Sequence, residues 1–458
     1  MPYSSESVYT GEYNEKPDIN FELYAEQLCR IAVKATASSK EAFTVGIFGS
    51  WGSGKTTLMR CIKNKLSDPR LFQKLFSDKD PLGKTRCKTI WVNPWKYDGK
   101  EDVRNALIQT ILGEMANDPD LDQGKRKEIM EKAMGLSLSL YRLAGHTLRG
   151  TIKALTSGGL DTKYISDEIE KAIQGGDNRS VIDPYQYVNN FEEIFKSLVK
   201  NYVGDNGRLA IFIDDLDRCL PENALTVLES LKLYLAQVNC IFFIGLDKRV
   251  IEQAVSQRYR DVKITGKEYI EKIIRLNFFL PDKDPDEVKK IFQLVPIITG
   301  KYDLLGNEQE KEEAEKLWDM ILQATKANLR KVEQFIIAFE LIEKIVEGLN
   351  KKNRENNKPE INWQATYPML AKILLLQMNF PDFYDALERN YILMEKIKKV
   401  SDDTQDKDLK LKAVQDKYPL CYDPILIEFI IDRFDYGKIS SSEDWKVIHK
   451  LSKAVIYE

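Results

Sequence analysis

The stretch Gly49–Thr56 reads GSWGSGKT and satisfies the pattern G-x-x-x-x-G-K-[ST]. Glycines at this spacing let successive backbone N–H groups turn inward around phosphate oxygens, and the N-terminus of a following helix adds positive charge. We expect Lys55 to reach the β- and γ-phosphates of a nucleotide, Thr56 to ligate Mg²⁺, and Thr57 to contact the α-phosphate. The predicted nucleotide-binding residues of this loop are Gly49, Ser50, Trp51, Gly52, Ser53, Gly54, Lys55, Thr56 and Thr57. The alternative is a glycine-rich turn without function.

A second group of reactive side chains follows an apolar run in LAIFIDDLDR, residues 209–218. Mg²⁺ in such a site needs a carboxylate beyond the carboxyl end of a strand, beside the phosphate loop. We expect Asp214 to belong to the Mg²⁺ shell. Asp215 or Asp217 would then orient and deprotonate the attacking water, and the sequence does not choose between them. The alternative is an acidic turn that closes a strand.

These motifs require a sheet that brings the ends of several strands together. Apolar runs predict buried strands at 42–48, 88–93, 209–213 and 240–246, with a fifth candidate at 274–280. Stretches with helical spacing lie between them, which predicts a mostly parallel five-stranded sheet with helices on both faces. We therefore expect an α/β P-loop NTPase fold with a helical insert and an all-α C-terminal region.

The pattern along the chain divides it into five parts. They are a flexible N-terminal arm at 1–20, a P-loop core at 21–102 and 204–281, a helical insert at 103–203, a helical lid or sensor subdomain at 282–349, and a C-terminal helical domain at 350–458. The polar stretch Asn350–Glu360 is the expected linker between the last two parts.

Composition excludes several classes of protein. The 458 residues include 43% hydrophobic and 30% charged residues and carry a net charge of −3, so no global field attracts nucleic acid or anionic lipid. Two histidines and six cysteines without a CxxC pair argue against zinc enzymes and histidine-based triads. The start of the chain lacks an apolar signal region, so a cytoplasmic location is expected. The sequence contains no N-K-x-D tetrad, the motif that recognises guanine, which favours ATP over GTP as the nucleotide.

Four segments together carry a resemblance to a known family: GSWGSGKT, WVNPWKY, IDDLDRC and FFIGLDKRVIEQAV. They are similar to the corresponding segments of the KAP family of P-loop NTPases, and the likeness runs from about Phe21 to Ile342. YIEKIIRLNFFLP and NLRKVEQF fit later segments of the family. The resemblance implies a regulated ATPase, and the family is linked to phage exclusion and antiviral defence in bacteria.

The resemblance also assigns roles at matching positions. Gly49, Gly54, Lys55 and Thr56 fall on the nucleotide loop of the family, and Asp214, Asp215, Asp217 and Arg218 on its acidic motif. It implies catalytic roles for Lys55, Asp215, Asp217 and Arg218. Asp247 corresponds to a sensor of the γ-phosphate, and Arg330 to an arginine that closes on the nucleotide. The alternatives are ion pairs for Arg218 and Arg249, and a solvated helix face for Arg330.

Many KAP proteins carry transmembrane helices between the phosphate loop and the acidic strand, and this chain differs there. Met134–Leu155 is the most apolar part of the interval, but Arg142, His146, Arg149 and Lys153 interrupt it. Such charges at mid-membrane would cost several kcal/mol. We expect a soluble helical insert without an integral membrane segment. A surface-lying amphipathic helix is the alternative.

Three functions of different classes fit the motifs. The first is a Mg-dependent, ATP-hydrolysing switch in bacterial antiviral defence, which acts as a homo-oligomer or through a separate effector protein. The second is an ATP-driven motor that remodels nucleic acid or protein, although the balance of charges does not support a nucleic-acid partner. The third is a scaffold that binds ATP with little hydrolysis. Trp91 and Trp95 are expected to pack against the core rather than on a base.

Overall fold

The structure is a computed structural model with two compact units, Asn20–Pro281 and Asp282–Glu458. The residues it describes are 21–38, 41–76, 80–98, 103–129, 132, 184–233, 239–260, 265–292, 308–402, 406–432, 435, 438–439 and 441–453. The predicted N-terminal arm and the apolar stretch Met134–Leu155 lie outside these residues. Among the described helices, none has both the length and the apolar composition that a membrane span needs.

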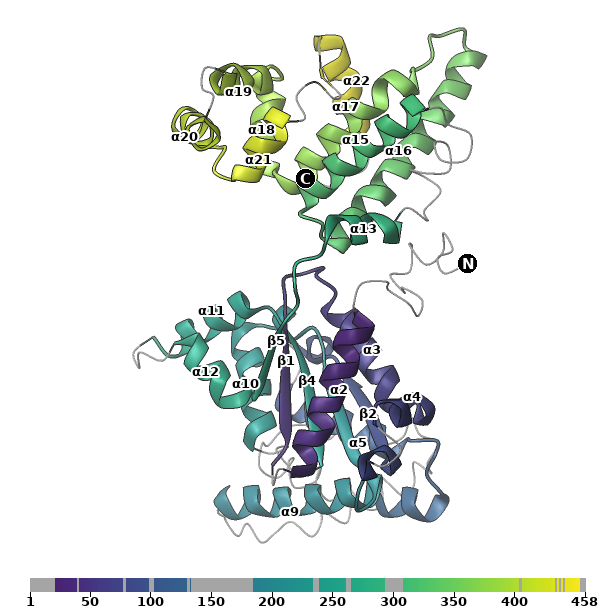
Figure 1. The fold of residues 1–458 in the computed structure, drawn as a ribbon, viewed down its shortest axis with the longest axis vertical. Coiled ribbons are helices and arrows are strands. Elements are labelled where there is room, and N and C mark those ends of the chain that lie inside the picture. The colour runs from purple at the N-terminus through teal and green to yellow at the C-terminus, as the bar shows by residue number, and fades with distance from the viewer. Residues whose placement is uncertain are drawn as a thin grey trace, which may run out of the picture. The chain divides into compact units, whose positions relative to one another are not determined.

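The first unit contains a five-stranded sheet whose neighbouring strands are all parallel, which confirms the predicted fold class (Figure 1). Its strands are β1 (Phe43–Phe48), β2 (Cys87–Val92), β3 (Arg208–Ile213), β4 (Cys240–Leu246) and β5 (Leu276–Phe279), in the spatial order β2-β3-β4-β1-β5. After β1 the chain continues to β2 at one edge of the sheet. After β4 it crosses over β1 and forms β5 at the other edge. Ligands of open parallel sheets bind at the carboxyl ends of the strands near such a reversal.

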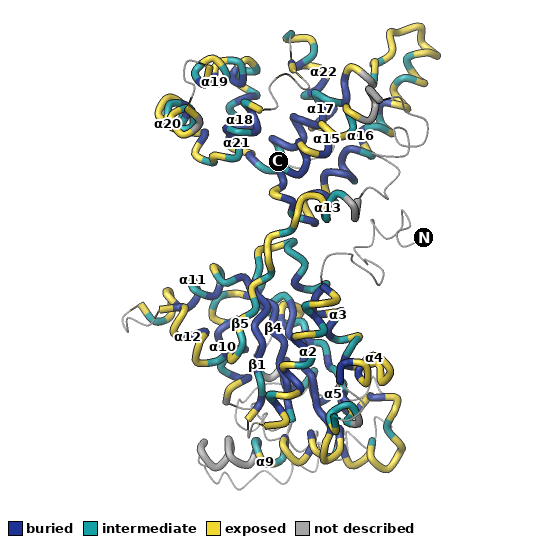
Figure 2. The backbone as a smooth tube through the Cα atoms, in the orientation of Figure 1, coloured by how far each residue is buried: buried dark blue, intermediate teal, exposed yellow. Residues whose placement is uncertain are grey.

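The central strands β3, β4 and β1 read as nearly continuous apolar runs because both faces of the sheet are covered there. Every residue of β3 and β4 is buried, and Figure 2 shows the strands as the buried centre of this unit. The β5 edge strand alternates between half-buried and exposed residues. Strand β2 ends at Val92, one residue earlier than predicted, so Asn93 follows the strand rather than belonging to it.

Helices cover both faces of this sheet. On one face, α2 (Phe21–Ser38) packs on α3 (Lys55–Ser67), which also contacts β2, β3 and β4. On the other, α10 (Pro221–Leu233) lies between α5 and α11 (Figure 1). The remaining elements of this unit are α4 (Pro69–Lys74), α5 (Val103–Ala116), α9 (Pro184–Val203), α11 (Lys248–Arg258), α12 (Gly266–Ile273), and the short 3₁₀ helices η1 (Pro81–Lys84), η2 (Pro94–Tyr97) and η3 (Leu216–Arg218).

The region predicted as a helical insert contains α5 and α9 where the structure describes it. Helix α5 contacts both β2 and α10, so it belongs to the layer that covers the sheet. Apolar residues of α5 and α9 join the same buried core as the strands, among them Leu107, Ile111, Phe191 and Phe195. The ends of the predicted insert are therefore part of the packed core.

The second unit is all-α in its described residues, as predicted. Its helices are α13 (Pro285–Phe292), α15 (Glu308–Thr325), α16 (Leu329–Glu355), α17 (Trp363–Asn379), α18 (Pro381–Arg389), α19 (Leu393–Asp402), α20 (Lys407–Lys417), α21 (Pro424–Asp432) and α22 (Ser442–Ser452). The expected linker at Asn350–Glu360 is shorter in the structure because α16 continues to Glu355. Lys, Arg and Glu in that stretch are good helix formers, which outweighs their polarity.

Candidate nucleotide site

The phosphate loop connects β1 directly to α3 and needs its glycines for geometric reasons. Gly52 and Gly54 have φ angles of 77° and 101°, which residues with a side chain rarely adopt. A Cβ atom on Gly49 would lie 2.4 Å from the Ser53 Oγ atom. The turn is closed by a hydrogen bond from the Ser53 backbone N–H to the Ser50 carbonyl, at 3.2 Å. The result is a tight loop whose chain passes straight into the N-terminus of a helix.

Lys55 is the first residue of α3 and is buried. Its Nζ donates hydrogen bonds to the carbonyl oxygens of Gly49 and Ser50 at 2.9 and 3.3 Å. The same ammonium group forms an ion pair with Asp217 Oδ2 at 3.0 Å. The lysine is therefore held over its own loop, with a buried carboxylate as its counter-charge.

Thr56 meets the acidic motif at its first carboxylate. Its hydroxyl donates to Asp214, 2.9 Å from Oδ2 and 3.2 Å from Oδ1. Asp214 is buried, and its pKa is raised because burial and the charge of Asp215 disfavour ionisation, while the Thr56 hydrogen bond opposes them. Gly245 on β4 leaves room for this carboxylate, because a Cβ there would lie 3.2 Å from Asp214 Oδ1.

The Thr56 hydroxyl and the Asp214 carboxylate fit Mg²⁺. Both are hard oxygen ligands, and they lie side by side at the start of a helix that faces the phosphate site. The described residues contain no group of three or more His, Cys, Asp or Glu side chains placed to hold a metal. Mg²⁺ at nucleotide sites usually takes only one or two protein ligands and completes its shell with phosphate and water.

Asp215 adopts an unusual backbone conformation, with φ 57° and ψ 26°. Its Oδ2 accepts a hydrogen bond from Asn93 Nδ2 at 2.7 Å, and its Oδ1 pairs with Arg218 Nε at 2.8 Å. The Arg218 guanidinium also lies over the ring of Trp95, 5.4 Å from its centroid. Arg218 thus forms the ion pair given above as its alternative.

Asn93 is a site residue that the sequence reasoning missed. The only signal for it was its place directly after an apolar strand, within WVNPWKY. Because β2 pairs with β3 in parallel, with Val92 opposite Ile213, the two strands end side by side. Asn93 and the acidic motif therefore meet at the same edge of the sheet.

Asp247 follows β4 and caps the N-terminus of α11. It accepts hydrogen bonds from the backbone N–H of Arg249 at 3.0 Å and from its guanidinium at 3.0 and 3.3 Å. Burial would raise the pKa of this carboxyl, but the Arg249 hydrogen bonds and the charges of Arg249 and Lys55 hold the pKa below its usual value. Arg249 is 80% exposed, so it is paired with its neighbour and not built into the site.

The other predicted contacts are placed as follows. Thr57 is half-buried in the first turn of α3, and Trp51 is 57% exposed on the loop. Arg330 is exposed at the start of α16, in the other compact unit, so its contact with a nucleotide stays a prediction.

The two tryptophans near β2 behave differently. Trp91 stacks on Phe212 with ring centroids 5.4 Å apart, as expected for core packing. The same expectation for Trp95 is wrong, because its side chain is 50% exposed. The cause is η2, which begins at Pro94 and turns the chain out of the strand direction, so that Trp95 reaches the surface beside Arg218.

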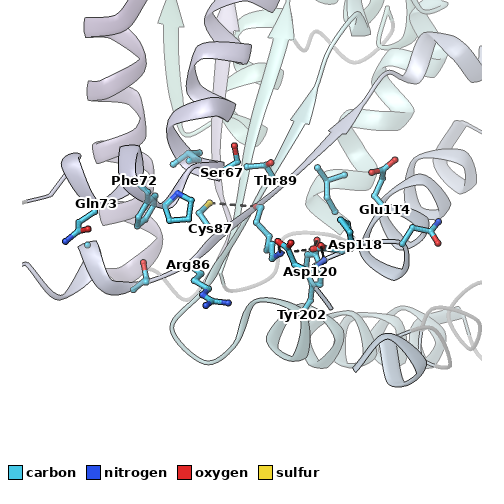
Figure 3. Close-up of a pocket in the computed structure, with 18 residues that line it drawn as sticks. Ser67, Phe72, Gln73, Arg86, Cys87, Thr89, Glu114, Asp118, Asp120 and Tyr202 are labelled. Atoms are coloured by element: carbon cyan, nitrogen blue, oxygen red, sulfur yellow. Dashed lines mark hydrogen bonds and ion pairs between the residues drawn. The ribbon is translucent and has the colours of Figure 1, made fainter. Parts of the chain in front are cut away.

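A hollow of about 730 Å³ lies at the opposite end of β2 from this site (Figure 3). Its walls come from the end of α3, from α4, from the start of β2 and from the end of α5. Inside it, Asp118 accepts a hydrogen bond from the Tyr202 hydroxyl at 2.6 Å and pairs with Lys88 at 3.0 Å. Burial would raise the pKa of Asp118, but the Tyr202, Asp120 N–H and Lys88 hydrogen bonds lower it. Asp118, Lys88 and Tyr202 thus satisfy one another's polar groups, and their contacts join β2 and α9 to the segment after α5.

The sheet order, the glycine loop and the acidic strand end define a P-loop NTPase domain. A family model described as the KAP family P-loop domain matches residues 21–346. The chain belongs to the KAP family.

Similar proteins were found among curated sequences and solved structures. The uncharacterized protein MJ0182 of Methanocaldococcus jannaschii is 27% identical over 169 residues, which cover 33% of this chain and 87% of that protein. The Aeropyrum pernix ORC2 protein in its ADPNP-ADP complexes is 13% identical at a TM-score of 0.35, with 94% of this chain and 84% of that chain covered. Cdc6p of Pyrobaculum aerophilum is 12% identical at a TM-score of 0.37, with 100% and 92% covered.

Proposed function

We propose that this chain is a Mg-dependent ATPase of the KAP type that acts as a nucleotide-controlled switch. One observation carries the proposal: the phosphate loop and the acidic motif meet although Thr56 and Asp214 are 158 positions apart. The Thr56 hydroxyl bonds the Asp214 carboxylate, and the Lys55 ammonium group pairs with another carboxylate, that of Asp217. Those are the groups that a phosphate-bound Mg²⁺ and a γ-phosphate require.

Each residue of the site has a distinct task in this proposal. The loop N–H groups hold the phosphate oxygens, and Lys55 exchanges its loop carbonyl acceptors for the β- and γ-phosphates. Thr56 and Asp214 would hold Mg²⁺, which neutralises phosphate charge when it is bound. Asp217 keeps the Lys55 ammonium group oriented through their ion pair. Asp215 orients the attacking water and accepts its proton.

Two further residues would report the state of the nucleotide. Asp247 is close enough to Lys55 for the ammonium charge to lower its pKa, which supports a role beside the γ-phosphate. Arg330 would contact the nucleotide from the helical unit and couple that unit to the site. The family resemblance supports a role in bacterial antiviral defence, in which the nucleotide state controls assembly with further copies or action on a separate effector.

Calorimetry with Mg-ATP tests the binding step. We expect wild-type protein to release heat and Lys55→Ala to bind about 10- to 100-fold more weakly, because one charge-assisted hydrogen bond to phosphate is worth about 1.5–3 kcal/mol. Lys74→Ala, on the exposed face of α4, is the matched control and should bind normally. Absence of heat with the wild-type protein would refute the proposal.

Phosphate release separates a hydrolysing switch from a scaffold. Asp215→Asn should retain Mg-ATP binding and lose about 100-fold or more in kcat, since general-base catalysis contributes about 10²- to 10⁴-fold. If the wild-type protein binds Mg-ATP without releasing phosphate, the chain is a scaffold.

A further inference from the structure

We propose that Asn93 and Arg218 are positioning residues that clamp Asp215 from two sides, and that the exposed Trp95 holds Arg218 in this clamp. The inference rests on the proposed function, in which Asp215 orients the attacking water. It assigns roles to Asn93 and Trp95, and it explains why Asp215 rather than Asp217 is the water-orienting carboxylate.

The three carboxylates of the acidic motif have different partners. Asp214 accepts the hydroxyl of Thr56, and Asp217 pairs with the ammonium of Lys55. Both are therefore committed to side chains of the phosphate loop. Asp215 instead makes its side-chain contacts with Asn93 and Arg218, which lie outside the loop. Of the three, Asp215 is the one whose carboxylate is not bound by a side chain of the phosphate loop, and each of its oxygens keeps a second lone pair that can accept from a water.

The two contacts to Asp215 fix its direction. They come from separate parts of the chain, because Asn93 follows β2 and Arg218 belongs to η3, and each takes a different oxygen. A non-glycine residue in the left-handed region costs about 1–3 kcal/mol and persists only where its surroundings hold it. Asp215 is in that region: its backbone carbonyl accepts the Arg218 N–H at 3.2 Å, and Asn93 and Arg218 hold its side chain.

The Asn93 side chain lowers the free energy of unfolding in a way that packing alone does not explain. While its amide nitrogen bonds Asp215, its Oδ1 is buried without a hydrogen-bond partner among the described residues. A buried acceptor in this state costs about 1–3 kcal/mol. An apolar side chain at this position would avoid the cost, so the amide is explained by what it does to Asp215.

Trp95 supports the clamp from the surface. Its indole is 50% exposed, although a large aromatic ring favours burial, and the guanidinium of Arg218 lies over its face. The side chain of Arg218 is 32% exposed even with this contact, and the indole restricts it to the rotamer that reaches Asp215. The exposed Trp95 is thereby linked to the Asp215 carboxylate through Arg218.

Single-turnover and steady-state ATPase assays of Asn93→Ala, Arg218→Lys, Trp95→Ala and Trp95→Phe test the clamp. Asn93→Ala and Arg218→Lys should each lower kcat about tenfold or more, because a misplaced group loses its alignment, while the Mg-ATP Kd stays within twofold. Trp95→Ala should lower kcat severalfold, and Trp95→Phe, which keeps an aromatic face, should lose less. Asn64→Ala, an exposed residue of α3, is the control.

A double-mutant cycle distinguishes positioning from general support of the fold. In an Asp215→Asn background, Asn93→Ala should cause no further loss in kcat, since both changes remove the same function. Equal loss in both backgrounds, or an increase in Kd that matches the loss in kcat, would overturn the clamp. Full activity of Asp215→Asn alone would also overturn it. If the wild-type protein does not bind Mg-ATP, the proposed function itself has failed.

Discussion

At the scale of single residues, the site concentrates negative charge in a buried place and offsets only part of it. Asp214 and Asp217 are both 5% exposed, and one ammonium group, that of Lys55, pairs with Asp217. Asp214 has a hydroxyl as its partner, and its pKa is raised in consequence of burial and of the neighbouring Asp215 charge. A cation bound beside Asp214 would remove this imbalance of charge, as the Mg²⁺ of the proposed function would.

Asp214→Asn tests this reasoning through stability and pH. The pKa of Asp214 is higher in the folded chain than in the unfolded one, so its ionisation destabilises the folded chain above that pKa. We expect the variant to unfold at a higher urea concentration than wild type at neutral pH, and to lose about tenfold or more in Mg-dependent ATP affinity. The stability difference should shrink as the pH falls through the raised pKa, because wild-type Asp214 then becomes neutral. A lower urea midpoint for the variant at neutral pH would contradict the assignment.

At the scale of elements, the phosphate loop depends on backbone shape more than on side chains. Gly54 caps α3 in the left-handed region, and Gly49 lies so close to Ser53 that a side chain there would collide. The strand before the loop and the helix after it are both anchored in the core by apolar residues. The loop can therefore hold its N–H groups in place at little cost when phosphate binds.

Gly54→Ala should weaken Mg-ATP binding and lower the free energy of unfolding by about 1–2 kcal/mol, because alanine is strained at a φ of 101°. Gly348→Ala is a matched control in the interior of α16, where an added Cβ meets nothing within 4 Å. There the same substitution should raise stability by about 0.5–1 kcal/mol. Calorimetry and urea unfolding measure both effects. Unchanged nucleotide affinity in Gly54→Ala would show that the loop does not bind phosphate in this conformation.

At the scale of the whole molecule, the chain joins a nucleotide-binding unit to an all-α unit at Pro281–Asp282. Strand β5, beside β1 and its phosphate loop, ends only two residues before this junction. A change at the loop therefore has a short covalent path to the helical unit. Mg-ATP can shift an equilibrium between two conformations of the chain only by as much as its affinities for the two conformations differ.

We expect Mg-ATP to change both the X-ray scattering profile and the rate of protease cleavage at residues 281–284. At a Mg-ATP concentration near the wild-type Kd, Lys55→Ala should show almost none of either change, since it binds about 10- to 100-fold more weakly. Arg330→Ala should reduce them while leaving binding within a fewfold of wild type. Profiles and cleavage rates that are identical with and without Mg-ATP would exclude the switch and leave a simple hydrolase.

Much of the fold was predictable from the sequence because its signals are local. A strand buried on both faces is apolar along nearly its whole length, as β4 and β3 after Arg208 are, and a phosphate loop must carry glycines at fixed positions. The short fifth strand was also predictable, although every second residue of it is exposed. The length of α16 was not, since a polar helix end and a polar linker have similar compositions.

The sequence by itself determined which chemical groups the site contains: a loop of glycines, a lysine, a hydroxyl and a run of carboxylates. Only the tertiary structure decided their partners. The order β2-β3-β4-β1-β5 puts Asn93 beside Asp215, so that Asp215 and Asp217 have different partners although they are two residues apart in one turn. The physical reason is that parallel strands pair across long intervals of chain, so a residue's contacts at a strand end depend on which strand lies next to it.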